Sequence, residues 1–343
     1  MIYLCQKAAH LMMNQSRLLL FFFALTTLTY MACDDDGDMR APVAYNPNCC
    51  VYSTMQRDDV NQRWEAVIEL ATGNWDTIPE TVRPAASFQL PIGVNRLNDF
   101  SGNRHLYTDF NGVNLVVQDL TTFDTTRLAL NDPETGQKIE GSLFLQEGRN
   151  SDEYFLYSGL EGRVYGIDLA ARSLSVALDT FPLGFDLLND FVYSPSENYF
   201  VFMGQINQGF TERLYTATIY DNTTKNLVAR DTFPQRLFGF VPDPDVGRMF
   251  ALTFPENQFG YRLYEVQFRG ADGLSYTELS DENLAIGQLS EQLQTLHTAS
   301  NSYLCYGESP PFKVIYQLDL DSGDLRAQIV LEEFDRMIKL DGE

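Results

Sequence analysis

The chain has 343 residues and a formal net charge of −23 at pH 7. So negative a long-range field repels phosphates, which argues against nucleic acid as a partner. Hydrophobic residues make up 44% of the chain and charged residues 21%, which is the composition of a globular protein rather than a disordered one. All-β propellers of this length form one domain, so the length alone does not require two.

The first feature along the chain is an uncharged apolar run at residues 18–30. It is shorter than the roughly 20 residues of a membrane-spanning helix and has the length of a signal-peptide core. Ala32 and Cys33 follow, and this junction resembles the processing site of bacterial lipoproteins, although the two residues before Ala32 depart from that family's usual pattern. The resemblance implies that residues 1–32 are a signal peptide and that Cys33 carries a lipid that anchors the protein to the membrane. An ordinary secretory signal is the alternative.

An acidic stretch, "DDDGD", follows at residues 34–38. It resembles the export signals of Bacteroidota surface lipoproteins, and this implies an outer-membrane location facing the cell exterior. A plain solvated tether would explain the same residues. Either way, we expect residues 33–40 to be an acidic tether and residues 41–343 to be the folded domain.

The rest of the chain contains an internal repeat. "DTFP" occurs at residues 179–182 and 231–234, and the related "DTIP" occurs at residues 76–79. Periods of 20–50 residues are typical of solenoids and propellers, and these spacings indicate a unit of about 50 residues.

Each unit contains four strand-like runs. The second run is the most apolar, and these second runs lie at residues 50, 105, 154, 199, 249 and 303. The third and fourth runs form hairpins around Gly, Asn, Asp and Ser, as in "RVYGIDLAARSLSVAL". Six such units predict an all-β fold, a six-bladed β-propeller of four-stranded blades. Seven blades are the alternative, because the segment 76–104 has room for another strand pair.

Two segments carry a resemblance to known propellers. "YQLDLDSGDL" and "FVYSPSENYFVF" resemble blade segments of bacterial propeller proteins in general, without indicating one subfamily. The sialidase box of six-bladed enzymes does not occur in any unit.

Residues typical of catalysis are scarce. His105 and His297 are the two histidines outside the leader, and they share no spacing that suits a metal pair. The sequence contains no G-x-S-x-G elbow, P-loop or dinucleotide fingerprint. We therefore assign no catalytic residue, metal or cofactor and favour a protein that is not an enzyme. A pair of carboxylates acting on a polysaccharide is the alternative.

Three cysteines follow the tether: Cys49, Cys50 and Cys305. Cys49 and Cys50 begin the second run of blade one, and Cys305 lies in the second run of blade six, its neighbour in a closed ring. A bridge from Cys305 to Cys49 or Cys50 would lock the ring, but stacked sheets lie about 10 Å apart, farther than a disulfide normally spans. Buried thiols and a Cys49–Cys50 bridge are the other two interpretations.

Long loops gather on one face of the predicted ring, and rigid scaffolds usually carry their function in such loops. Blades four, five and six each place one phenylalanine there, spaced by about one unit, with amide side chains beside them: Phe210, Phe259 and Phe312, with Gln208, Asn257 and Gln258. Aromatic rings beside amides suit a glycan or an extended peptide. The alternative is that the rings only pin down their own loops.

These features predict a lipid-anchored binding or accessory module at the cell surface, serving glycan or peptide capture beside an outer-membrane transporter. The alternative is a hydrolase or lyase on the propeller scaffold, because fold alone does not decide between binding and catalysis.

Overall fold

The computed structural model describes these residues: 48–57, 62–78, 83–84, 96–99, 102, 104–109, 112–119, 122, 124–141, 143–150, 152–179, 185, 187–208, 213–233, 235–253, 260–280, 284, 288–309, 312–331 and 336–341. All of them belong to one compact unit, Ala44–Glu343. The predicted signal peptide, Cys33 and the acidic tether lie outside the described residues.

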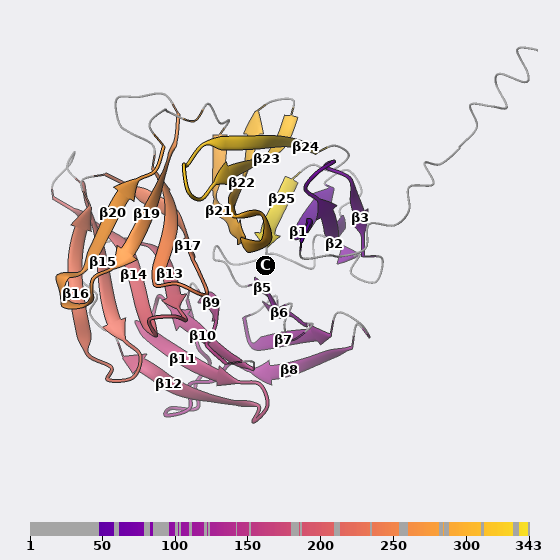
Figure 1. Ribbon diagram of the computed structural model, residues 1–343. Helices are drawn as coiled ribbons and strands as arrows, with labels where there is room; N and C mark the ends of the chain where they lie inside the picture. Colours follow the sequence, from indigo (N-terminus) through magenta and orange to yellow (C-terminus); the bar gives the residue numbers. More distant parts are fainter. Residues whose placement is uncertain are drawn as a thin grey trace, which may run out of the picture. The chain divides into compact units, whose positions relative to one another are not determined.

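The described strands form six sheets that follow one another around a ring (Figure 1). Each sheet contains a run of four antiparallel strands, and one sheet has a short fifth strand in addition. From the innermost strand outward, blade one is β25 (Arg336–Asp341), β1 (Cys50–Arg57), β2 (Gln62–Glu69) and β3 (Trp75–Thr77); blade two is β5 (Arg96–Asp99), β6 (Arg104–Thr108), β7 (Asn114–Asp119) and β8 (Thr125–Ala129). Blade three is β9 (Leu143–Glu147), β10 (Glu153–Ser158), β11 (Arg163–Asp168) and β12 (Ser173–Asp179); blade four is β13 (Leu187–Ser194), β14 (Tyr199–Asn207), β15 (Arg213–Asp221) and β16 (Leu227–Phe233). Blade five is β17 (Leu237–Pro242), β18 (Arg248–Thr253), β19 (Arg262–Phe268) and β20 (Leu274–Glu278); blade six is β21 (Gln288–His297), β22 (Ser302–Ser309), β23 (Phe312–Asp319) and β24 (Leu325–Leu331).

This architecture confirms the predicted six-bladed β-propeller, and the alternative of seven blades is wrong. The segment that left room for a seventh blade instead holds β4 (Arg83–Pro84), a two-residue strand that pairs with β2 of blade one. Helical structure among the described residues is limited to the short 3₁₀ turns Gly270–Asp272 and Thr298–Ser300. No helix in the described part of the chain is long and apolar enough to cross a membrane.

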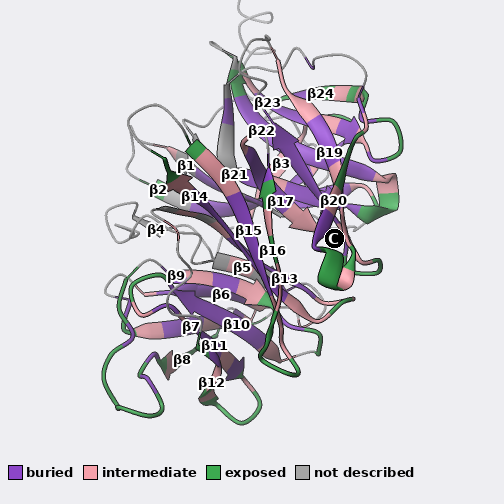
Figure 2. Ribbon diagram, turned by 90° about the vertical axis from the view of Figure 1, so that its left-hand side faces the viewer, coloured by how far each residue is buried: buried purple, intermediate pink, exposed green. Residues whose placement is uncertain are grey.

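The second strand of each blade is buried on both faces, because a blade packs between two neighbours (Figure 2). On β10, Tyr154 and Leu156 pack in a cluster with residues of blade two. Phe155 and Tyr157 point the other way and pack in a cluster with residues of blade four. Successive side chains of a strand point to opposite faces, so a strand covered on both sides must be apolar throughout. For this reason the second strand-like run of each unit is apolar throughout and does not alternate between apolar and polar residues.

Four of the hairpins between third and fourth strands, in blades two, three, four and six, share one device. An aspartate ends the third strand and accepts one or two backbone N–H groups of the turn that follows. Asp319 Oδ1 accepts the N–H of Asp321 at 2.7 Å and of Ser322 at 2.9 Å, and Asp221 Oδ1 does the same with Thr223 and Thr224 at 2.6 and 2.8 Å. Asp is favoured at turns because its side chain can accept these N–H groups and hold the reversal.

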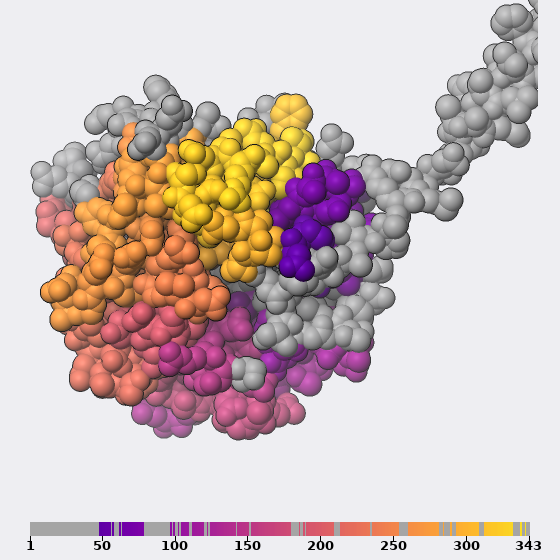
Figure 3. Space-filling view, in the orientation of Figure 1, coloured from indigo at the N-terminus to yellow at the C-terminus, as the bar shows by residue number. Residues whose placement is uncertain are grey.

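The ring closes by joining the two ends of the domain. β25, the last of the described strands, pairs antiparallel with β1, the first of them, with Ser53 opposite Leu340 and Tyr52 opposite Asp341. The C-terminal strand therefore supplies the innermost strand of blade one, and the two ends lie side by side (Figure 3). The buried side chains of Met337 and Leu340 join the core between blades six and one.

Candidate functional site

The order of strands defines two faces of the ring. We call the face with the connections from first to second and from third to fourth strands the turn face. We call the opposite face, with the connections from second to third strands and from blade to blade, the loop face. The repeated "DTFP" and "DTIP" segments begin at the ends of β12, β16 and β3, where each blade leads into the next. The loop face therefore carries the longer connections, as predicted.

Phe312 is the predicted aromatic ligand residue that the structure describes. It begins β23 on the loop face, opposite Ser309 of β22, and its side chain is 53% exposed. Gln208, also a predicted ligand residue, is exposed at the end of β14. Phe210, Asn257, Gln258 and Phe259 lie outside the described residues, so the convergence of the three rings on one sector stays a prediction.

Polar groups surround the strand ends near these positions. The Tyr306 hydroxyl donates to Glu308 Oε1 at 3.2 Å, one strand away from Phe312. In blade four, Gln205 Nε2 donates to Asn207 Oδ1 at 2.7 Å, just before Gln208. Both pairs sit at the loop-face ends of second strands. An exposed ring can contact the apolar face of a ligand, but the strand register places the Tyr306 and Glu308 side chains on the opposite face of blade six from Phe312.

Three exposed apolar side chains lie in or directly after connections between second and third strands, on the loop face: Val113, Leu160 and Phe312, with 36, 66 and 53% exposure. Leu227 and Val246, each 52% exposed, lie on the turn face instead. Single exposed apolar residues need no functional explanation. Exposed apolar residues on the two faces can nevertheless be paired by similar exposure, and such pairs allow a test of which face binds a ligand.

The ring-locking bridge, one of the three interpretations of the cysteines, is not formed in the structure. On β22, Leu304 and Tyr306 pack in the core shared with blade one, whereas Cys305 packs in the core shared with blade five. The alternation of β22 thus turns the Cys305 side chain away from Cys49 and Cys50. None of the three is in a disulfide in the structure, and the Sγ atoms of Cys49 and Cys50 lie 3.3 Å apart.

Both histidines are buried within blades. His105 Nε2 lies 3.7 Å from Glu65 Oε1, across the junction of blades one and two, and Glu65 Oε2 accepts the Thr54 hydroxyl at 2.7 Å. His297 Nδ1 lies 2.6 Å from the Ser300 hydroxyl in the turn that follows β21. Among the described residues, no group of three or more His, Cys, Asp or Glu could hold a metal ion.

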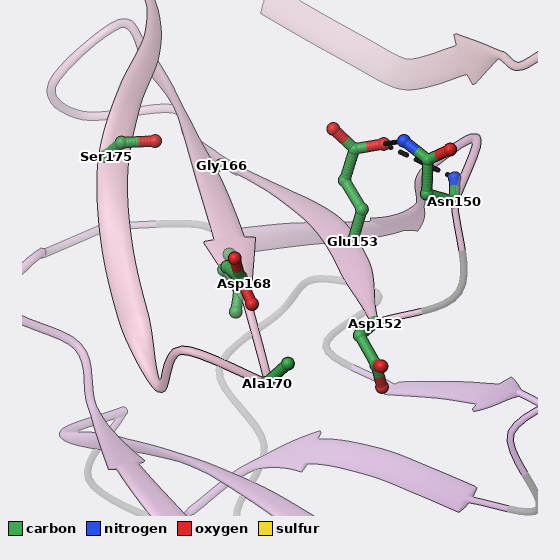
Figure 4. Close-up of a pocket in the computed structure, with 8 residues that line it drawn as sticks. Asn150, Asp152, Glu153, Gly166, Asp168, Ala170 and Ser175 are labelled. Carbon is green, nitrogen blue, oxygen red and sulfur yellow. Dashed lines mark hydrogen bonds between the residues drawn. The ribbon is translucent and has the colours of Figure 1, made fainter.

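Sequence reasoning missed an open pocket of about 430 Å³ on the turn face of blade three (Figure 4). Glu153 and Asp168 lie directly opposite each other on β10 and β11 and both line it. Glu153 Oε2 accepts the Asn150 side-chain amide at 3.1 Å, as the dashed line in Figure 4 shows. Gly166 and Ser175 leave the space open because they are small. The sequence contains these residues, but which acids face each other depends on the strand register.

Sequence reasoning also missed a half-buried acid at the innermost strands. Asp190 on β13 accepts the N–H of Phe191 at 2.9 Å, and the N–H of Phe240 on β17 also binds its carboxyl group. Desolvation by the surrounding protein raises the pKa of Asp190 to about 7, although the two N–H groups oppose the shift. A bulge in β17, where Gly239 has φ +63°, presents the carbonyl of Gly239 to the Tyr303 hydroxyl of blade six at 2.6 Å. These contacts join blades four, five and six.

Comparison with known proteins identifies the fold and not a family. No protein-family model matches the sequence, and no curated protein matches it. TolB from Acinetobacter baumannii is similar in structure, with a TM-score of 0.60 and 12% identity over 87% of this chain and 67% of that chain. A chain of the nidogen/laminin complex has a TM-score of 0.51 and 9% identity, over 85% of this chain and 97% of its own. Identities this low show a shared propeller fold alone.

Proposed function

We propose that this protein is a binding or accessory module, held at the outer surface of the outer membrane by a lipid on Cys33. Its loop face captures a glycan or peptide beside an outer-membrane transporter. The observation that carries the proposal is Phe312, an aromatic ring more than half exposed at the first position of a strand, on the face with the longest connections. A rigid propeller can hold such a ring in place without paying the entropy of ordering a loop on binding.

The ligand-binding part is tested by comparing two single variants on glycan and peptide arrays. Phe312→Ala should reduce retention at least 10-fold, because burying a phenylalanine side chain contributes about 1.5–3 kcal/mol. Leu227→Ala is the matched control, since Leu227 has nearly the same exposure, 52% against 53%, but lies on the turn face. Both substitutions are at exposed positions, so unfolding midpoints should stay close to wild type. Equal binding by the wild type and Phe312→Ala, or equal loss in both variants, would contradict a loop-face site around this ring.

The anchoring part is tested at Cys33. Cys33→Ser should abolish metabolic labelling with palmitate and shift the protein from the membrane fraction to the soluble fraction. Stable anchoring needs more than one acyl chain, and lipoprotein processing supplies it. Cys49→Ser is the control and should keep the label, because Cys49 lies within the folded domain. Palmitate label on the Cys33→Ser chain would rule out this anchor. Protease shaving of intact cells then decides whether the domain faces the exterior.

A structural candidate for the enzymatic alternative is the pair of facing acids Glu153 and Asp168 in the pocket of blade three. A glycosidase needs two carboxyl groups within about 10 Å on either side of the scissile bond. If the protein cleaved a polysaccharide, and Glu153→Gln abolished cleavage while Phe312→Ala did not, the binding proposal would fall and this pocket would be the site.

A further inference from the structure

The two adjacent cysteines where the chain enters the ring lie unusually close. The Sγ atoms of Cys49 and Cys50 are 3.3 Å apart, whereas a disulfide bond measures about 2.05 Å. Closing this gap requires a movement of little more than 1 Å, within the reach of side-chain rotation at the end of a strand. The other described cysteine, Cys305, is fully buried and faces blade five. Among the described cysteines, Cys49 and Cys50 are therefore the two whose thiols can react with each other.

The two thiols differ in access. Cys49 is half-buried in the turn before β1, and Cys50, the first residue of β1, is 2% exposed. An incoming reagent therefore reaches Cys49 first. Cys50 is shielded from reagents but lies against the sulfur of Cys49, which is the arrangement of an attacking and a resolving thiol.

We propose that Cys49 and Cys50 form a reversible vicinal dithiol–disulfide couple. In the oxidising step, the Cys49 thiolate attacks a disulfide supplied by a small molecule or a thiol–disulfide exchange protein. One thiolate leaves, and Cys49 is held in a mixed disulfide. The Cys50 thiolate then attacks Cys49 Sγ and expels the second thiolate. The pair loses two protons and two electrons, and the oxidant becomes two thiols.

Adjacency makes this bond labile. Neighbouring Cα atoms are about 3.8 Å apart, below the roughly 4.4–6.8 Å that disulfides usually span. Strained and exposed disulfides have higher reduction potentials than structural ones and are the regulatory type. Closing the disulfide would disturb only a few backbone contacts, but these lie next to the ring closure. The carbonyl of Cys49 accepts the N–H of Leu70 at 2.9 Å, and Cys50 pairs with Glu69, two residues before β1 meets β25 at Tyr52. Oxidation thus acts at the edge of the ring closure.

The test uses the full folded chain in glutathione buffers, followed by acid quenching, alkylation and tryptic mapping. The peptide 41–57 contains Cys49 and Cys50 and no other cysteine. After oxidised glutathione, this peptide should be two hydrogens lighter and carry no alkyl group. After reduced glutathione, without denaturant, it should carry two alkyl groups. Two alkyl groups under both conditions would overturn the proposal, and so would a stable glutathione adduct on the wild-type peptide.

Two variants separate the couple from other thiol chemistry. Cys50→Ala removes the resolving thiol, so a glutathione adduct should accumulate on Cys49. Cys305→Ser should leave the behaviour of the 41–57 peptide unchanged, because Cys305 lies on the far face of blade six. If Cys50→Ala fails to fold, Cys49→Ser, at the more exposed position, tests the same point: Cys50 should then remain a single alkylatable thiol after oxidised glutathione. Adduct formation on Cys50 in that variant would contradict the assigned roles.

Discussion

Asp190 shows how one residue can make stability depend on pH. Its pKa is raised from 3.8 to about 7 because burial disfavours the carboxylate, against two backbone N–H groups that favour it. The native state therefore binds this proton more tightly than the unfolded chain does between these two values. The contribution of Asp190 to stability is greatest below pH 4 and falls as the pH rises to about 7. At higher pH the charge on this half-buried group costs stability, by less than about 4 kcal/mol because solvent screens part of it.

Replacing Asp190 by Asn should remove this dependence, because the amide is neutral at every pH and still offers an oxygen to the N–H groups of Phe191 and Phe240. We expect the variant to be more stable than the wild type at pH 8 and close to it below pH 4, as measured by urea unfolding. Asp272→Asn, at an exposed position, removes the same charge without burial and is the control. Parallel pH profiles for the wild type and Asp190→Asn would show that Asp190 does not titrate in this range.

At the scale of elements, the hairpin of β23 and β24 depends on Asp319. Burial opposes its ionisation, but the N–H groups of Ser322 and Asp321 and the Arg326 guanidinium outweigh this and lower the pKa of Asp319 below 3.8. A lowered pKa adds stability that is complete above the ordinary value and is lost as the pH falls through the folded-state value. Gly323, at φ +74°, completes the turn.

Asp319→Ala should destabilise the protein by about 1–3 kcal/mol at pH 7, because hydrogen bonds to a charged group are lost and turn N–H groups lose their acceptor. Asp319→Asn keeps an acceptor oxygen and loses the charge, so it should fall between the wild type and the alanine variant. Urea unfolding at pH 7 and pH 3 measures both, and the difference between the wild type and Asp319→Ala should shrink at pH 3. A difference that stays constant with pH would mean that the carboxylate charge contributes nothing.

At the scale of the whole molecule, the ring depends on the pairing of its first and last strands. Leu340 on β25 is 2% exposed and packs with residues of blades six and one. Leu340→Ala should therefore cost about 2–5 kcal/mol, the usual range for a buried leucine. Val330→Ala on β24 is the control, since Val330 is 45% exposed and the change should stay within about 0.5 kcal/mol. Equal small effects would indicate that blade one holds together without β25.

Opening the ring would also expose the edge of β1, and unpaired edges invite pairing with other chains. The leucine variant should thus form more aggregate than the valine variant on heating. Light scattering during a thermal ramp makes this comparison directly.

The sequence by itself determined the four-stranded organisation of each blade. The spacing of "DTFP", the apolar second runs and the acid-capped hairpins are local patterns, and local patterns specify strands and turns. They predicted six units, the order of strands within each and the face that carries the long connections. The exposed Phe312 could be predicted for the same reason, because it follows from its place in one hairpin.

Only the tertiary structure decided what depends on partners distant in sequence. That β25 completes blade one is a pairing between the two ends of the domain, and no local pattern marks it. The direction of Cys305 depends on strand register, since a shift of one residue would turn its side chain to the opposite face of the blade. The raised pKa of Asp190 and the pocket around Glu153 arise from backbone and side chains that other strands bring into place. The burial, pKa and surroundings of these side chains depend on residues that are distant in sequence. For this reason the sequence alone did not predict them.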